Sequence, residues 1–107
     1  MEIYLLTATN ISNTLDLDVN TLSFKEYDDA VAEMKCKILE DLHNFNDYRE
    51  MDIYEQEKFV ERLLSGSSEA LNLHNITYDK TAQTYTRTFL YSHRMYNLSI
   101  QKTVVKM

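Results

Sequence analysis

The chain has 107 residues, 44% of them apolar and 26% charged, and its net charge at pH 7 is −6. This length suits one domain with a buried core, so we expect a single domain over residues 1–107. The single glycine, Gly66, excludes the glycine-rich loops that hold phosphates in P-loop and Rossmann proteins. The single cysteine, Cys36, excludes an internal disulfide and a four-cysteine zinc site.

The first residues predict a strand and no targeting segment. Residues 2–8 contain the continuous apolar run from Ile3 to Leu6, which is typical of a buried strand. The start lacks the basic region and long apolar stretch of a signal peptide, and no apolar run approaches the ~20 residues that cross a membrane. We therefore expect a cytoplasmic protein without a membrane partner.

A second strand is predicted after a turn at residues 10–13. Residues 15–19 alternate apolar and acidic side chains, which indicates a half-buried strand with Asp16 and Asp18 exposed. The apolar positions then change parity at Leu22, so we expect a bulge or the end of the strand near Asn20.

The next segment predicts a first helix. Ser23 and Glu26 fit the S-x-x-E capping box, so the helix is expected to begin close to Ser23 or Lys25. Apolar residues then recur at helical spacing, at Tyr27, Val31, Met34, Ile38, Leu42 and Phe45. Residues 43–51 lose this pattern and are expected to form a connection.

A second helix is predicted from Asp52 to Gly66. Asp52 and Glu55 imitate a capping box, and Gly66 is placed to end the helix. Its apolar side carries Ile53, Val60, Leu63 and Leu64. The cluster at residues 65–68 is the candidate for a flexible joint.

The remaining residues predict strands. Leu73, Ile76 and Tyr78 suggest a short strand, and segments 84–91 and 96–104 alternate apolar and polar residues, with a hairpin loop at 79–82 and a turn at 92–94. The order β-β-α-α-β-β-β predicts an α+β fold, in which an antiparallel sheet of four to five strands has two helices packed on one face.

Charge is distributed unevenly along the chain. Residues 1–61 carry a net −10 and residues 62–107 a net +4. A dense acidic surface on the two helices attracts basic partners and competes for sites built to hold phosphates. The candidate partner-binding residues are Asp29, Glu33, Glu40, Asp41, Glu55, Glu57 and Glu61. The alternative is that these charges only keep the protein soluble.

The C-terminal strands suggest a different function. Basic residues alternate there with aromatic ones, a combination that can stack and hold single-stranded nucleic acid; the residues are Arg87, Arg94, Lys102 and Lys106 with Tyr85, Phe89, Tyr91 and Tyr96. Aromatic residues and threonine also favour strands without any ligand. A third alternative is an oligomeric structural protein, such as a homodimer paired through an exposed edge strand.

No residue pattern indicates catalysis or a cofactor. On a helix, the neighbours of Cys36 include Glu33 and Glu40, which disfavour a thiolate, so a structural or exposed thiol is expected. The three histidines fall on different predicted elements without metal-binding spacing, and surface or turn positions are expected; they are His43, His74 and His93. We expect no catalytic residue, no metal site and no cofactor.

Two segments carry a family resemblance. Residues 1–7, MEIYLLT, and 24–31, FKEYDDAV, resemble a pattern common in small proteins of phages and mobile elements, in which a hairpin leads into a helix. The resemblance covers about the first 45 residues. Such proteins include anti-CRISPR and other anti-defence inhibitors, which implies a non-enzymatic inhibitor or adaptor. Its partner would be a protein with a basic surface, such as a nucleic-acid-handling enzyme, and no direct contact with nucleic acid is expected.

Overall fold

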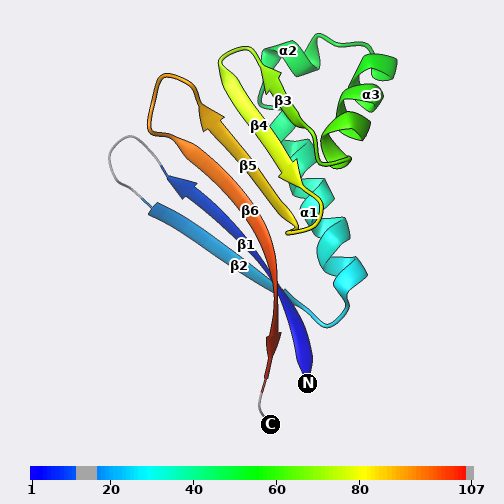
Figure 1. Cartoon of the computed structure of the whole chain (residues 1–107), viewed down its shortest axis with the longest axis vertical. Coiled ribbons are helices and arrows are strands. Elements are labelled where there is room, and N and C mark those ends of the chain that lie inside the picture. The colour runs from blue at the N-terminus through cyan, green and yellow to red at the C-terminus, as the bar shows by residue number, and fades with distance from the viewer. Residues whose placement is uncertain (12–16, 106–107) are drawn as a thin grey trace.

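The computed structural model describes residues 1–11 and 17–105, and this part of the chain has an α+β fold. Six antiparallel strands form one sheet in the order β2-β1-β6-β5-β4-β3 (Figure 1). The elements in chain order are β1 (Glu2–Ile11), β2 (Leu17–Phe24), α1 (Tyr27–Leu42), α2 (Asn46–Arg49), α3 (Ile53–Leu64), β3 (Ser68–Leu71), β4 (His74–Asp79), β5 (Thr84–Phe89) and β6 (Met95–Val104). The predicted class and antiparallel sheet are confirmed. The predicted count of four to five strands and two helices omitted β3 and the four-residue α2.

The two ends of the chain meet in the middle of the sheet. The strands β1 and β6 pair along their whole length, from Glu2 opposite Val104 to Ile11 opposite Met95. At the end of this pair, the backbone N–H of Val105 donates to the carbonyl of Met1 at 2.8 Å. The hairpin β1–β2 therefore extends one side of this central pair, and the hairpins of β3–β6 extend the other.

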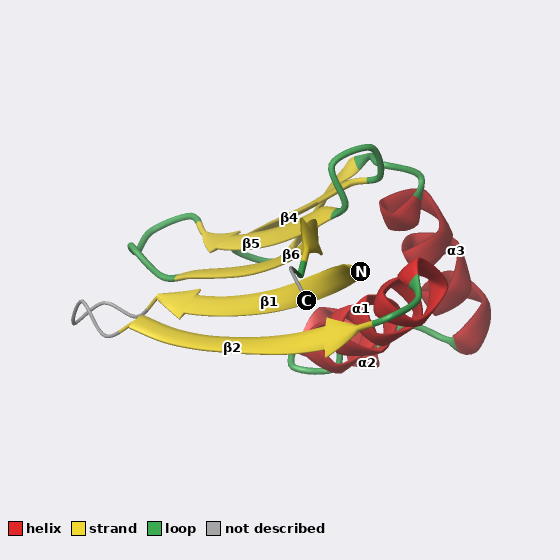
Figure 2. Ribbon diagram, turned by 90° about the horizontal axis from the view of Figure 1, so that it is seen from below, coloured by secondary structure: helices red, strands yellow, loops and turns green. Residues whose placement is uncertain are grey.

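One face of the sheet carries the core. Residues directly opposite each other on neighbouring strands share a face. On one such face, Leu6 of β1 lies opposite Ile100 of β6, and Leu98, two residues before Ile100, lies opposite Tyr85 of β5; all four are buried. Helix α1 packs there against β1, β2 and β6, and α3 packs against β3 and β4. Figure 2 shows the three helices gathered on one side of the strands. The other face of the sheet has no helix in the described part of the chain.

Of the two predicted starts of the first helix, Ser23 is wrong, while Lys25 lies one residue before the observed N-cap. Ser23 lies in β2 opposite Leu5, and α1 begins at Tyr27 with Glu26 as an N-cap that makes no side-chain capping bond. The described residues have neither the bulge nor the strand end expected near Asn20, because Asn20 pairs in register with Ala8 and β2 continues to Phe24. Ladder hydrogen bonds to β1 thus keep the backbone extended as far as Phe24, against the local capping signal.

Strand β2 is more exposed than its alternating sequence indicated. Leu17 and Val19 are exposed, although the alternation predicted that they would be buried. Both lie opposite β1 residues of the helix-free face, and β2 is an edge strand. Asp18 is exposed as expected, while Asp16 lies outside the described residues.

Both end signals of the second predicted helix are confirmed in α3. The Asp52 carboxylate accepts the backbone N–H of Glu55 at 2.8 Å. The helix ends at Leu64, and Gly66 follows it with a φ of +94°, a conformation that favours glycine. Where a flexible joint was expected, the structure has a hydrogen-bonded turn into β3.

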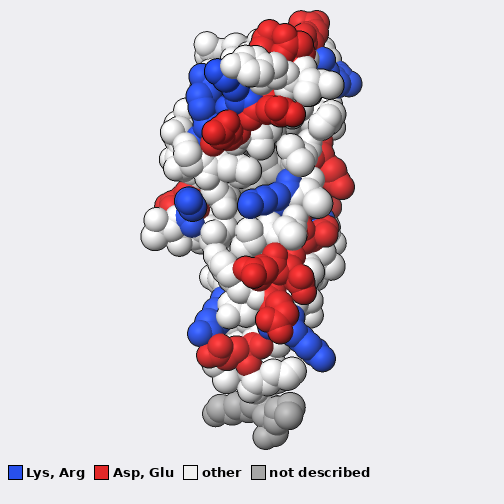
Figure 3. All heavy atoms as spheres, turned by 90° about the vertical axis from the view of Figure 1, so that its right-hand side faces the viewer, with Lys and Arg blue, Asp and Glu red and all other residues white. Residues whose placement is uncertain are grey.

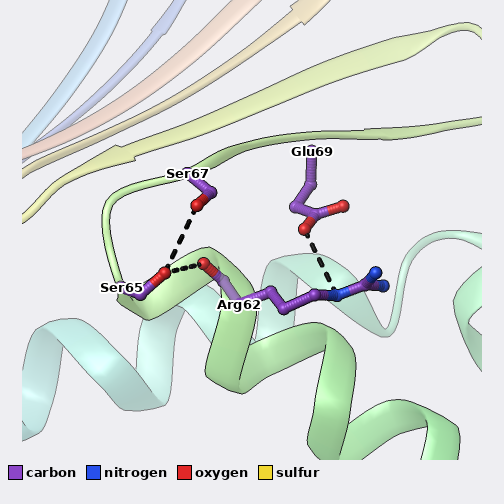
Figure 4. Close-up of polar contacts among 4 residues, drawn as sticks. All are labelled: Arg62, Ser65, Ser67 and Glu69. Carbon is purple, nitrogen blue, oxygen red and sulfur yellow. Dashed lines mark hydrogen bonds and ion pairs between the residues drawn. The ribbon is translucent and has the colours of Figure 1, made fainter.

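Figure 4 shows how this turn is held. The hydroxyl of Ser65 donates to the carbonyl of Arg62 and lies 3.3 Å from the hydroxyl of Ser67. The Arg62 guanidinium forms an ion pair with Glu69 of β3 at 3.5 Å. These contacts connect the last turn of α3 to the edge of the sheet that it covers.

The predicted hairpin loop between β4 and β5 is confirmed. The Asp79 carboxylate accepts the backbone N–H groups of Thr81 and Ala82 at 2.9 and 3.0 Å. Gln83 closes the loop with a φ of +53°. The expected turn at residues 92–94 likewise joins β5 to β6. No helix in the described residues is long and apolar enough to cross a membrane.

Candidate protein-binding surface

Asp41 holds α1 to the sheet from inside the molecule. Its side chain is 5% exposed and accepts hydrogen bonds from the Tyr85 hydroxyl at 2.6 Å and the Arg87 Nε at 3.1 Å. Burial and the adjacent Asp41 carboxylate raise the pKa of Tyr85 well above its ordinary value, so the hydroxyl stays a donor. Asp41 therefore does not belong to the exposed acidic surface that the sequence suggested.

Arg87 is enclosed by aromatic rings. Its guanidinium carbon lies 5.1 to 5.5 Å from the ring centres of Phe45, Phe89 and Tyr96. A polar hollow of about 370 Å³ adjoins it, lined also by Lys37, Glu40 and Asn44. Because its charge is engaged by Asp41 and these rings, Arg87 has a structural role in the described fold.

His74 does not occupy the surface position expected of it. Its ring lies between Phe45 and Phe89, with centres 4.6 and 4.0 Å away. The Nδ1 atom is buried without a hydrogen-bond partner in the described structure. Burial, followed by the nearby Arg87 charge, lowers the pKa of His74, so the neutral ring is favoured.

The described residues show no cluster of side chains that could hold a metal ion. In residues 1–11 and 17–105, no three or more His, Cys, Asp or Glu side chains are placed to hold a metal ion. Cys36 is exposed on α1, one of the two placements expected for it. His43 and His93 are exposed, as expected.

The acidic residues of α1 form a mixed surface with basic ones. Asp29 and Glu40 are exposed, while Glu33 lies 4.0 Å from the Lys37 ammonium, four residues along the helix. Figure 3 shows red carboxylates along the helical side of the molecule interrupted by blue lysines and arginines. The predicted acidic face is therefore not a continuous carboxylate patch.

A groove between α1, α2 and α3 combines apolar and acidic side chains without a cation. It has a volume of about 410 Å³ and is lined by Leu39, Tyr48, Ile53, Gln56, Glu57, Val60 and Glu61. We call it the helical groove. Its apolar residues remain accessible, since Leu39 is 39% and Ile53 74% exposed. The Gln56 amide donates to the Tyr48 carbonyl at 3.0 Å and fixes α2 against α3.

A second hollow on the other side of α3 has mixed charge. It measures about 540 Å³ and is lined by Met51, Tyr54, Glu55, Lys58, Glu61 and Arg62. The Lys58 ammonium lies 4.7 Å from the centre of the Tyr54 ring. Glu55 thus lies beside basic side chains, and Glu61 lines this hollow as well as the helical groove. Of the seven predicted residues, only Glu57 and Glu61 line the cation-free helical groove.

The structure brings only some of the residues suggested for nucleic-acid stacking together. Phe89, Tyr91 and Arg94 line one small hollow of about 220 Å³. Tyr85 is buried and Tyr96 half-buried on the face that the helices cover. Tyr91 is exposed near the turn before β6, and Arg94 lies over Phe89 at 4.6 Å. Lys106 lies outside the described residues.

Comparison of the chain with protein-family models, with curated proteins and with solved structures found no match. The resemblance to phage and mobile-element proteins stays an expectation. The candidate site therefore depends on the geometry of the chain itself.

Proposed function

We propose that this chain is a non-enzymatic protein-binding module, an inhibitor or adaptor, whose helical groove receives a basic and apolar segment of a partner protein. The observation that carries the proposal is the composition of the groove. Glu57 and Glu61 flank the exposed Leu39 and Ile53, and no lysine or arginine lines the groove.

The electrostatics of the groove favour a cationic partner. Glu57 and Glu61 are four residues apart on α3, so the two carboxylates are neighbours on the helix surface and repel each other by about 0.2–0.5 kcal/mol. Within the described residues, neither forms an ion pair. A lysine or arginine placed between them relieves this repulsion, and the attraction also speeds association.

The apolar residues of the groove supply the burial that charge alone does not. Exposed charge pairs contribute about 0.2–1 kcal/mol each, whereas burying apolar surface contributes about 25 cal/mol per Å². The volume, about 410 Å³, lies at the low end of the range for ligand pockets. It therefore suits a few anchoring side chains, such as those along one face of an amphipathic helix.

Binding to the helical groove would cover the basic surface of the partner protein. A basic surface that binds the helical groove is no longer free to hold phosphates, which supports the inhibitor form of the proposal, with a nucleic-acid-handling enzyme as the target class. The acidic residues of α1 outside the groove, such as Asp29 and Glu40, would strengthen the long-range attraction.

The test is a matched pair of charge reversals. Glu57→Lys with Glu61→Lys changes the groove, while Asp18→Lys with Glu26→Lys makes the same change in net charge at exposed sites on β2 and before α1. Proteins are captured on the wild-type chain from nuclease-treated lysate at low salt. The dissociation constant of each captured protein is then measured for wild type and both variants.

The expected result is a basic partner whose dissociation constant rises at least about tenfold for the groove variant, and with added salt, but changes little for the control. An equal loss of affinity in both variants would show that the binding comes from general charge attraction and not from the helical groove. Undiminished binding to the groove variant would exclude the helical groove as the site.

A further inference from the structure

The sheet face opposite the helices is nearly free of charge. Strand register places alternate residues on this face, including Ile3, Thr7, Ser99 and Thr86 from β1, β6 and β5. Every described strand residue on this face is uncharged except Asp79, which lies at the end of β4 with its carboxylate bonded to the loop. We call this surface the open sheet face.

The lack of charge on the open sheet face contrasts with the rest of the chain. A quarter of all residues are charged, and the net charge is −6. Solvent-facing sides of antiparallel sheets are normally polar. Strand preference favours threonine over lysine and glutamate, but it does not require every charge to be absent. The charged side chains instead lie on the helices, on the turns and on the helix-covered face of the strands.

We propose that the open sheet face binds a second copy of this chain, so that two sheets stack face to face in a symmetric dimer. Two copies with a net charge of −6 repel each other wherever their helical sides meet. On the open sheet face this repulsion is smallest, because the carboxylates lie elsewhere. The described residues of this face include no lysine or arginine, so it offers no cation to neutralise nucleic acid phosphates.

The area is sufficient for a dimer. The paired strands β1 and β6 have ten residues each, and β2 has eight. At about 4.8 Å between strands and about 3.4 Å per residue, the six strands cover about 700 Å². A stable interface buries about 800 Å² on each partner, and protruding side chains raise the accessible area above the flat value.

The apolar residues define how the copies would be oriented. On this face, Ile11 of β1 lies opposite Leu17 of β2, Val19 is two residues further along β2, and Ile3 and Leu5 lie toward the other end of β1. All three residues of β5 on this face are threonine, and its neighbours β4 and β6 present mostly uncharged polar residues there. A two-fold axis running across the strands places each strand opposite its own copy, so the apolar half meets the apolar half. Sheets stacked in this way keep their strands roughly aligned, as in β-sandwiches.

A charge placed on the open sheet face tests the dimer. Thr7→Lys introduces a cation near the centre of this face, and Ser99→Lys does the same from β6. Both variants lower the net negative charge, so weaker association cannot come from general repulsion. The control Asn20→Lys makes the same charge change on the exposed strand β2, on its helix-covered side.

Sedimentation velocity over about 5 to 500 μM measures the dissociation constant of the dimer, and circular dichroism checks that each variant is folded. We expect a dimer for the wild type and for Asn20→Lys, and at least a tenfold weaker dimer for Thr7→Lys and Ser99→Lys. A wild type that stays monomeric over this range would overturn the proposal.

Cysteine crosslinking separates face-to-face stacking from edge-to-edge pairing of β2. In a Cys36→Ser background, Thr7→Cys is expected to crosslink to its own copy and Asn20→Cys is not. Crosslinking at residue 20 alone, or dissociation by Asn20→Lys alone, would overturn the stacked arrangement in favour of edge pairing. These assays need no partner protein, so their outcome is independent of the helical groove.

Discussion

Replacing Asp41 by alanine tests the polar contact that joins α1 to the sheet. The substitution removes the acceptor for both the Tyr85 hydroxyl and the Arg87 Nε. Removing one partner of a buried ion pair costs about 3–5 kcal/mol, because the other charge stays buried. Arg87 is 13% exposed beside a polar hollow that gives it access to water, so the low end applies. We expect Asp41→Ala to lower the free energy of unfolding by about 3 kcal/mol.

Urea unfolding followed by circular dichroism measures this loss. With a slope of about 1.5 kcal/mol per molar urea, the midpoint falls by about 2 M. The matched control is Glu40→Ala, the exposed neighbouring residue on α1, which should change stability by less than about 0.5 kcal/mol. An Asp41→Ala variant as stable as this control would refute the structural role.

A double-mutant cycle assigns the loss to the pair rather than to either residue. Arg87→Met removes the cation but keeps an apolar side chain among Phe45, Phe89 and Tyr96. If the two residues stabilise each other, the double variant loses about 1–3 kcal/mol less than the sum of the single variants. Strict additivity would contradict the direct contact.

Two further predictions concern a helix cap and a histidine. Asp52→Ala removes the acceptor for the Glu55 N–H and should lower the free energy of unfolding in urea by about 1 kcal/mol. Ser23→Ala, in an exposed strand position, should lower it much less. Equal losses would contradict the observed helix starts. Burial lowers the pKa of His74 below 6.5, so the unfolded chain binds the proton more readily and stability falls as pH drops through 6.5. His74→Phe should reduce this loss between pH 7.5 and 5.5, and an unchanged pH slope would contradict it.

Local sequence signals predicted the elements that depend on nearby residues. The apolar spacing in α1 and the alternation in β5 follow from which side chains each element buries. The Asp52 cap and the Gly66 stop depend on contacts within a few residues. The elements that were missed, α2 and β3, have four residues each and are too short to show a period.

Long-range pairing explains the errors. Ser23 satisfies a capping pattern, but its pairing with Leu5 in β1 keeps it in a strand. Tertiary contacts of this kind commonly override local preference. The placement of Asp41 could have been inferred, because it follows Met34 by seven residues and Ile38 by three, within the apolar stripe of α1. A carboxylate in that stripe needs a buried partner.

The candidate surfaces differ in how far sequence could reveal them. Glu57 and Glu61 were among the predicted binding residues, but the cation-free helical groove depends on where α2 places Tyr48 beside α3 and α1. The open sheet face is spread over six strands, and only their register shows that its residues form one uncharged surface. The sequence shows the alternation within each strand, but it does not show which strands pair or in which register.

The two proposed surfaces lie on opposite sides of the sheet and would not compete. The helical groove is formed by α1, α2 and α3, and the open sheet face has no helix over it in the described structure. A dimer stacked through the open sheet faces would direct both grooves outward, with the two acidic helical sides as far apart as the molecule allows. Such a dimer presents two equivalent sites to a partner, and binding a partner with two basic segments would gain from the higher effective concentration of the second site. The uneven charge of the chain is then consistent with both surfaces, since carboxylates attract a basic partner on one side and are excluded from the contact between copies on the other.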